Sequence, residues 1–200
     1  MSMAGCSSSG ETAHPEPSGA PQPTTTSMFA PVTESAFSLA LAGMEIIEDE
    51  FNENVYVVPK EFIYLSEGSR AVQLAAGLGR DDKSSPWEAG ASVSYAADDF
   101  LQMDTLDLKS AAGVYTITGL DIGRTDDYLR GRPYENGFKM LSDSEFSDVC
   151  ETLSGDELKI RLSGSAGSIT LDVTTKKRQA LYASCTVFAG VKQGFPITTK

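Results

Sequence analysis

The sequence predicts an α+β fold, made mostly of antiparallel β-sheet, in which two C-terminal helices flank a β-hairpin. Three observations lead to this prediction: two alternating apolar and polar segments near the C-terminus, apolar residues at helical spacing on either side of them, and a series of short strand candidates earlier in the chain. The close spacing of those candidates, with no helical period between them, favours antiparallel neighbours over parallel crossover units. A sandwich-like arrangement of the strands is compatible with the same pattern.

Residues 1–36 are predicted to form a disordered tether. Ser, Pro, Thr, Gly and Ala dominate this segment, and its larger apolar residues are Met1, Met3, Met28, Phe29 and Val32. Such a segment cannot bury enough apolar surface to offset the entropy lost on ordering. We therefore divide the chain into a tether (1–36), a single globular α+β domain (37–194) and a C-terminal tail (195–200).

The domain is expected to open with an apolar patch and a run of acidic residues over 37–53, and we interpret the acidic run as a solvated face. The strand candidates that follow are interrupted by turn residues. They are Val55–Val58, Phe62–Leu65, Ala71–Leu78, Ser92–Ala97, Phe100–Met103, Thr105–Lys109 and Val114–Thr118, the last two forming a hairpin. Residues 119–140 are polar and contain glycine, so we interpret them as a long connection.

The C-terminal region carries the strongest local signals. Ser142 and Glu145 have the spacing of a capping box, and the helix that they begin is expected to end at Gly155. Residues 158–162 and 169–173 alternate apolar and polar side chains around a turn of small residues, which predicts a hairpin. A second helix is expected after it, with Thr174 or Thr175 as N-cap and the apolar residues Leu181, Cys185 and Phe188 on one face.

Two of the three cysteines, Cys150 and Cys185, fall on the apolar faces of these two helices. In an exported protein this arrangement suggests a Cys150–Cys185 disulfide, which would stabilise the fold by roughly 3–4 kcal/mol in the chain-entropy model. The alternative is a pair of buried free thiols that pack as small hydrophobic groups. The third cysteine, Cys6, would remain unpaired.

Cys6 lies in a motif of its own. Ala4-Gly5-Cys6, followed by three serines, resembles the end of a bacterial lipoprotein signal, in which the cysteine is lipidated and becomes the mature N-terminus. The basic and apolar stretch of such a signal is missing upstream, where only Met1-Ser2-Met3 stands, so we expect that the native signal is not part of this sequence. The alternative is an ordinary cysteine in a flexible tail.

Charge and hydropathy restrict the partners. The chain has 28 acidic and 16 basic residues and a net charge of −12, so its surface is repelled by nucleic-acid phosphates and by anionic lipid headgroups. No apolar run approaches the roughly 20 residues of a membrane-spanning helix. We expect no nucleic-acid partner, and contact with a membrane only through a lipid anchor.

Catalytic and cofactor motifs are scarce. The one histidine, His14, lies in the predicted tether, and the domain has no phosphate loop or dinucleotide fingerprint, so we expect no cofactor and no enzyme of the serine- or cysteine-triad kind. Asp98, Asp99 and Asp104 remain as candidate ligands for Ca²⁺ or as hydrolytic carboxylates. Acidic turn residues explain them equally well.

The aromatic residues are a second candidate. Some of them could form a binding patch, although we expect most to pack in the core. They are Tyr56, Tyr64, Trp87, Tyr95, Tyr115, Tyr128 and Tyr134.

Three segments together resemble a family of uncharacterised bacterial secreted or lipoprotein domains. They are residues 50–60, residues 94–101 with Tyr115 after the next turn, and residues 158–164. The chain departs from that pattern at Leu162, where an aromatic residue is expected, and at Phe100, where tryptophan is expected. The resemblance implies export and a single α+β domain, and it implies no activity.

The sequence therefore favours a lipid-anchored, non-enzymatic binding module on the extracellular face of a Gram-positive-type membrane. Its partner would be a cell-surface protein or a glycan, and we expect a monomer. Two alternatives stay open: a hydrolase or Ca²⁺-dependent carbohydrate-binding domain that uses the carboxylates above, and a structural spacer.

Overall fold

The structure is a computed structural model that describes residues 28–49, 51, 53–60, 63–82, 84–127 and 131–198. The lipidation prediction for Cys6 and the tether prediction for residues 1–27 lie outside the described residues. The elements are α1 (Glu34–Ala42), β1 (Met44–Glu48), β2 (Val55–Pro59), β3 (Ile63–Glu67), β4 (Arg70–Arg80), β5 (Glu88–Ala96), β6 (Met103–Ser110), β7 (Gly113–Ile117), β8 (Asp121–Asp127), β9 (Arg132–Leu141), α2 (Asp143–Ser154), β10 (Lys159–Gly164), β11 (Gly167–Asp172) and α3 (Thr175–Lys192).

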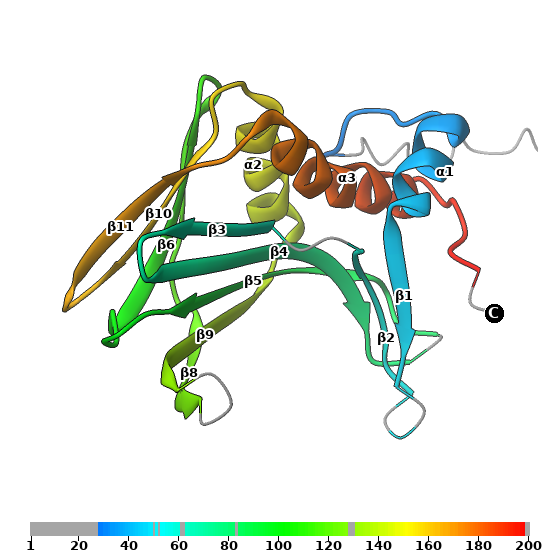
Figure 1. Ribbon diagram of the computed structural model, residues 1–200. Helices are drawn as coiled ribbons and strands as arrows, with labels where there is room; N and C mark the ends of the chain where they lie inside the picture. The colour runs from blue at the N-terminus through cyan, green and yellow to red at the C-terminus, as the bar shows by residue number, and fades with distance from the viewer. Residues whose placement is uncertain are drawn as a thin grey trace, which may run out of the picture.

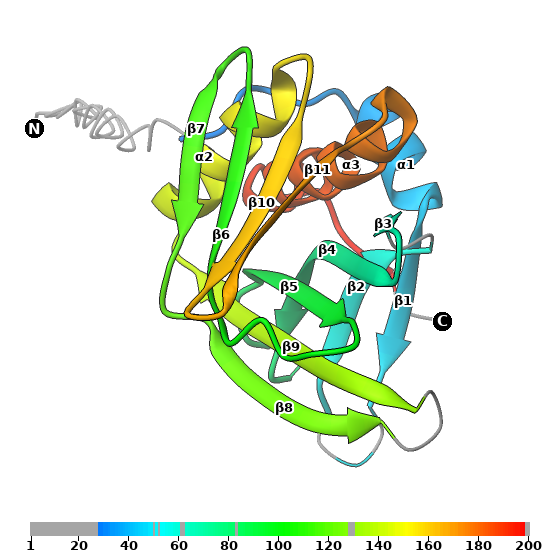
Figure 2. The ribbon, with the colours of Figure 1, turned by 60° about the vertical axis from the view of Figure 1, so that its left-hand side comes forward.

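The strands form two antiparallel sheets, so the predicted α+β class is confirmed. Sheet A has seven strands in the order β1-β2-β4-β5-β9-β8, with β3 also paired to β4, and sheet B has four in the order β11-β10-β6-β7. The two sheets diverge, and α2 and α3 lie between them on the wide side (Figures 1 and 2). The core lies where the helices meet the inner faces of both sheets.

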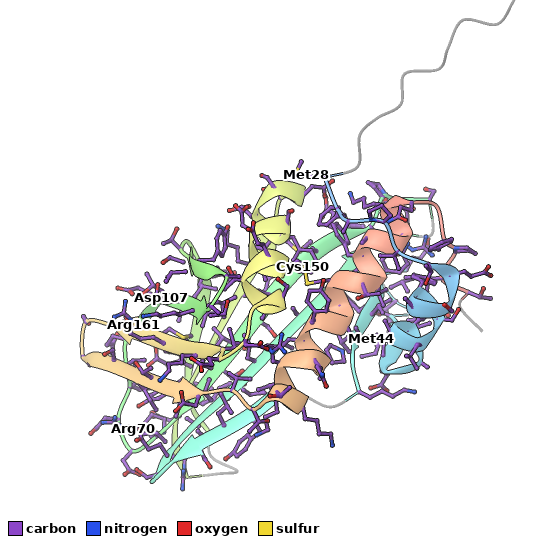
Figure 3. The ribbon with its side chains drawn as sticks, turned by 90° about the horizontal axis from the view of Figure 1, so that it is seen from above. Met28, Met44, Arg70, Asp107, Cys150 and Arg161 are labelled. Atoms are coloured by element: carbon purple, nitrogen blue, oxygen red, sulfur yellow. A yellow bond between two sulfur atoms is a disulfide. The ribbon has the colours of Figure 1, made fainter. Side chains whose placement is uncertain are left out.

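The C-terminal hairpin is confirmed as β10 and β11. Ile160 pairs with Leu171 and Leu162 with Ile169, and all four side chains are buried on the inner face of sheet B. On the opposite face of sheet B, a guanidinium nitrogen of Arg161 lies 2.6 Å from a carboxylate oxygen of Asp107 on the neighbouring strand β6 (Figure 3). The alternation read from the sequence thus corresponds to one buried and one solvated face.

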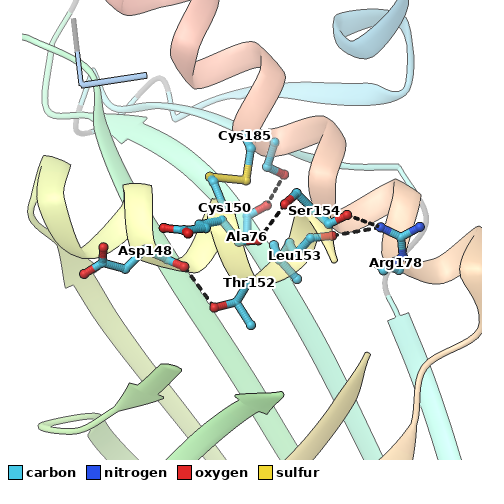
Figure 4. Close-up of a disulfide and its surroundings, with 10 residues drawn as sticks. Ala76, Asp148, Cys150, Thr152, Leu153, Ser154, Arg178 and Cys185 are labelled. Atoms are coloured by element: carbon cyan, nitrogen blue, oxygen red, sulfur yellow. Dashed lines mark hydrogen bonds between the residues drawn. A yellow bond between two sulfur atoms is a disulfide. The ribbon is translucent and has the colours of Figure 1, made fainter. Parts of the chain in front are cut away.

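The two predicted helices are confirmed as α2 and α3. The capping box is present: the Ser142 hydroxyl accepts a hydrogen bond from the Glu145 N–H, and the Glu145 carboxylate accepts one from the Ser142 N–H at 2.9 Å. At the other end of α2, the Arg178 guanidinium on α3 donates to the carbonyls of Leu153 and Ser154 at 3.1 Å each (Figure 4). A cation that satisfies terminal carbonyls also complements the helix dipole.

The predicted disulfide joins these helices. Cys150 on α2 and Cys185 on α3 are bonded, with their Cα atoms 5.7 Å apart (Figure 4). The bond closes a loop that contains the whole β10–β11 hairpin, since the cysteines are 35 residues apart. It therefore fixes the two helices that flank the hairpin.

The interpretation of residues 119–140 as a long connection is wrong, because these residues contain β8 and nearly all of β9. β9 lies inside sheet A, paired with β5 on one side and β8 on the other. Its inward positions include the buried Glu135 and Gly137, while Phe138 and Met140 point outward. This reverses the usual distribution of apolar and polar residues, so the strand carries no ordinary signal.

The predicted boundaries of the domain also need correction. Phe29, assigned to the tether, is buried against Phe188, and α1 begins at Glu34 behind the N-cap Thr33. At the other end, the ring of Phe195, assigned to the tail, lies 5.3 Å from the ring of Phe37. The packed region thus extends beyond 37–194 in both directions.

One local prediction agrees with the structure and another is wrong. The apolar patch and part of the acidic run in 37–53 form α1 and β1, and Glu45 and Glu48 are exposed on the edge strand β1, as expected for a solvated face. Phe100–Met103 is not a strand, since only Met103 belongs to one and Gln102 has a positive φ of 57°. The backbone N–H groups of Gln102 and Met103 instead donate to the buried Glu135 carboxylate, at 2.8 and 2.7 Å.

Candidate functional site

The face of sheet A that points away from α2 and α3 is the candidate site. Strands alternate their side chains between the two faces of a sheet, so on β4, β5 and β9 every second residue points away from the helices. Figure 1 shows the strands of sheet A arching away from the helices, with the other face open below them. We call this open side the outer face; two hollows lie on it.

The first hollow, of about 320 Å³, is mainly apolar. Tyr56 and Val58 on β2 form one wall, and Phe138 and Met140 on β9 form the other. Tyr56 and Phe138 are exposed to 40% and 43%, which is unusual for large rings that have a sheet beneath them. Exposed aromatic groups gathered in a concavity are typical of a binding surface.

Glycines form the floor of this apolar hollow. Gly77 on β4 is directly opposite Gly90 on β5. A Cβ atom at Gly90 would lie 3.0 Å from the Phe138 ring, and one at Gly77 would lie 2.7 Å from the carbonyl oxygen of Val57. The missing side chains thus create the depth of the hollow and allow the Phe138 ring to lie on the sheet.

The second hollow, of about 520 Å³, is more polar and lies farther along β4 and β5. Tyr64, Gln73, Ser94, Arg132 and Tyr134 contribute its polar groups. The Tyr134 hydroxyl donates a hydrogen bond to Ser94 Oγ at 2.8 Å. The Ser94 hydroxyl in turn donates one to Asn136 Oδ1 at 3.0 Å. These hydrogen bonds fix the positions of three neutral polar side chains on the outer face.

Charged groups lie at the ends of the two hollows rather than between them. The Arg80 guanidinium lies 4.4 Å from the centre of the Trp87 ring, in a cation–π contact. Arg132 Nη1 donates to the carbonyl of Ser69 at 3.0 Å. Asp81 and Glu88 border the apolar hollow. Tyr56 is held by a hydrogen bond at 3.0 Å from the Asn54 amide to its hydroxyl.

The structure does not bring the three predicted carboxylates together in one site. Asp98 and Asp99 follow β5 and border a different hollow, where Asp98 accepts a hydrogen bond from the Ser69 hydroxyl at 2.8 Å. Asp104 lies on β6 with its side chain exposed and does not border that hollow. Among the described residues, no group of three or more His, Cys, Asp or Glu side chains could hold a metal ion.

Of the aromatic candidates, Tyr128 lies outside the described residues, and the others divide between the outer face and the core. Tyr95 is buried, and burial raises the pKa of its hydroxyl above the usual 10.0. Tyr56, Tyr64 and Tyr134 line the hollows on the outer face. Phe138 and the glycine floor were not predicted from the sequence. The glycines of Gly77-Leu78-Gly79, at the end of a strand candidate, are the one signal that points to them.

No protein-family model, curated protein or solved structure matches this chain. The helices in the described part of the chain are all too short or too polar to cross a lipid bilayer.

Proposed function

We propose that this protein is an exported, lipid-tethered module that binds its ligand without chemical conversion, in the two adjoining hollows of the outer face. The observation that carries the proposal is the glycine-floored hollow between Tyr56 and Phe138. Large apolar rings are kept in contact with water there, although burial would be favourable. A bound ligand would remove that exposure.

Export is supported by the Cys150–Cys185 disulfide, because disulfides persist in oxidising compartments and are rare in the cytosol. Lipidation at Cys6 rests on the sequence motif and on the odd cysteine count. Acylation of Cys6 would place the domain on the outer side of the cell membrane.

The position of Met28 shows on which side of the domain the tether would attach. Met28 lies on the side of the helices, where the segment that it begins passes over α2 and α3 (Figure 3). The outer face of sheet A lies on the opposite side (Figure 1). A chain that is anchored through Cys6 would therefore attach on the side of the helices and leave the two hollows of the outer face uncovered by the attachment.

Binding without catalysis is the better reading of the lining. The groups between the two ends are aromatic rings, aliphatic side chains, hydroxyls and amides, which supply contact area and hydrogen bonds. The hydrolytic alternative requires two carboxylates on either side of a substrate. Asp98 and Asp99 are adjacent in sequence and line neither hollow. The two carboxylates that border the apolar hollow, Asp81 and Glu88, both lie beside the β4–β5 connection at one end of it.

The test is binding of the fluorescently labelled domain to isolated cell envelopes of the source organism. We expect saturable binding that Phe138→Ala weakens at least tenfold. The matched control is Tyr182→Ala, which removes an aromatic side chain of similar exposure on α3 and leaves the outer face intact. Equal binding by both variants, or no saturable binding by the unmodified domain, would contradict the proposal.

A further inference from the structure

We propose that the ligand of the outer face is a neutral oligosaccharide chain, which lies along β4 and β5 from the apolar hollow to the polar one. This inference rests on the function proposed above and specifies the class of ligand.

The polar groups of the outer face match sugar hydroxyls. Tyr134, Ser94 and Asn136 form a chain of neutral hydrogen-bonding groups, and Gln73 and Ser92 add a second amide and a third hydroxyl. Hydroxyls and amides both donate and accept hydrogen bonds. A sugar hydroxyl does the same, so either direction of each hydrogen bond can be satisfied.

The aromatic groups match the other chemical feature of a sugar. Tyr56 and Phe138 line the apolar hollow, and Tyr64 and Tyr134 line the polar one. Sugar rings have faces of C–H groups that are apolar, and an aromatic ring offers a flat apolar surface of similar width with a negative face. Rings in both hollows, beside neutral hydroxyls and amides, suit a chain of several sugars.

The dimensions favour a chain over a single sugar. At roughly 3.3 Å per residue, the stretch of β4 from Ala71 to Gly79 spans about 26 Å. The two hollows line this stretch, with Ala71 and Gln73 in the polar one and Gly77 and Gly79 in the apolar one. One monosaccharide would leave most of this length unoccupied.

Charge selects a neutral ligand. The chain carries a net charge of −12, and Asp81 and Glu88 border the apolar hollow, so an anionic polymer is repelled. The described residues that line the two hollows include no lysine. Their two guanidinium groups, on Arg80 and Arg132, contact Trp87 and the Ser69 carbonyl.

An extended peptide fits the outer face less well. Peptides that bind to sheets commonly add a strand at an edge, where unpaired backbone groups supply the hydrogen bonds. The floor of the two hollows is formed by β4 and β5; β5 is paired to β4 on one side and to β9 on the other. The floor therefore offers a ligand side chains and little free backbone.

The experiment is calorimetric titration with five-sugar chains: cellopentaose, xylopentaose, mannopentaose and chitopentaose as neutral probes, and pentagalacturonate as the anionic probe. We expect at least one neutral chain to bind. Phe138→Ala and Tyr64→Ala should each weaken that binding at least tenfold, while Tyr182→Ala leaves it within twofold. Ser92→Tyr, which places a ring over the middle of the surface, should abolish it.

The inference is overturned if none of the neutral chains binds at millimolar concentration, if Phe138→Ala and Tyr64→Ala both bind normally, or if pentagalacturonate binds as well as the neutral chains. Far-ultraviolet circular dichroism and the thermal midpoint of each variant confirm that it is folded.

Envelope binding separates this inference from the proposed function. Envelopes that have been extracted with organic solvent and digested with protease retain their glycans, so the labelled domain should still bind them. If binding to untreated envelopes depends on Phe138 but is lost after protease, the partner is a protein; the glycan inference then fails and the proposed function stands. If no binding depends on Phe138, the proposed function fails.

Discussion

At the scale of single residues, Glu135 is the most consequential side chain outside the hydrophobic core. Its carboxylate is completely buried, and it accepts hydrogen bonds from two backbone N–H groups and from Arg124 Nε at 3.2 Å. Arg124 also donates to the carbonyl of Met103 at 3.2 Å. A buried carboxylate that is hydrogen-bonded on both oxygens fixes the segment by which the chain leaves sheet A and enters sheet B.

Replacement of Glu135 should therefore be costly. We expect Glu135→Ala to lower the free energy of unfolding by about 3–5 kcal/mol, since it leaves the buried N–H of Met103 and the part-buried N–H of Gln102 without their acceptor. Urea denaturation measures the change. Glu151→Ala, at an exposed position on α2, is the control and should change the stability by less than about 0.5 kcal/mol. A similar loss in both variants would contradict this role of Glu135.

Glu145 gives a prediction about pH. The hydrogen bond from the Lys139 ammonium, at 2.8 Å, and those from Ser142 lower the pKa of Glu145 from 4.5 to about 2. Because the folded pKa lies below the unfolded one, this group stabilises the fold above about pH 4.5 and loses that effect as pH falls toward 2. NMR titration of the Glu145 carboxyl carbon should give a midpoint near 2, and Lys139→Met should raise it. If the Lys139→Met variant keeps the midpoint of the unmodified protein, the Lys139 ammonium is not the main cause of the lowered pKa of Glu145.

At the scale of elements, the helix pair and its disulfide hold the wide side of the molecule. α2 contacts both sheets and α3 lies over β2, β3 and β4. The buried Ser184 hydroxyl on α3 donates to the carbonyl of Ala76 at 2.6 Å. Ala76 lies where β4 changes partner, between the residues paired to β3 and those paired to β2. A helix hydroxyl thus supplies the hydrogen bond that a neighbouring strand does not.

The disulfide should contribute measurably to stability. Closure of a loop between cysteines 35 residues apart restricts the unfolded chain, so we expect the Cys150→Ala/Cys185→Ala double variant to lose about 3–4 kcal/mol. Chemical denaturation of the oxidised protein, the reduced protein and the double variant provides the comparison. The free energies of unfolding of the reduced protein and of the double variant should agree within about 1 kcal/mol. Equal stability of the oxidised protein, the reduced protein and the double variant would contradict the prediction.

At the scale of the whole molecule, the N-terminal segment determines on which side the tether leaves. Phe29 is 8% exposed, and its ring lies 5.2 Å from that of Phe188 in an edge-to-face contact. The Phe188 ring also contacts Phe146, at 5.0 Å. One aromatic cluster therefore joins the N-terminal segment, α2 and α3, and it holds the start of the domain opposite the outer face of sheet A.

Loss of this contact should be visible in the stability of the whole domain. We expect Phe29→Ala to cost about 3–5 kcal/mol, as is usual for a buried phenylalanine. Met28→Ala should change the stability by less than about 0.5 kcal/mol, because its side chain is 60% exposed. Thermal and urea unfolding test the pair. A small effect of Phe29→Ala would show that the folded domain starts later in the chain.

Local patterns were enough for several elements. The capping box of Ser142 and Glu145, the alternation in residues 158–173 and the two cysteines on apolar helical faces led to α2, the β10–β11 hairpin and the disulfide. Each of these depends on neighbours along the chain or on a simple period. β9 could not be predicted in the same way, because its inward Glu135 is stabilised by partners 32 and 33 residues away in sequence.

The sequence by itself determined the α+β class, the acidic surface, the hairpin with its two helices and the pairing of the two domain cysteines, because hydrophobic period, capping and charge are local properties. The tertiary structure alone decided where β9 lies, how Glu135 is satisfied, and that glycines from β4 and β5 lie beneath rings from β2 and β9. The physical reason is that the register of these four strands pairs residues up to 52 positions apart, as Ala89 with Leu141, and a surface made by four strands has no signature in any one of them.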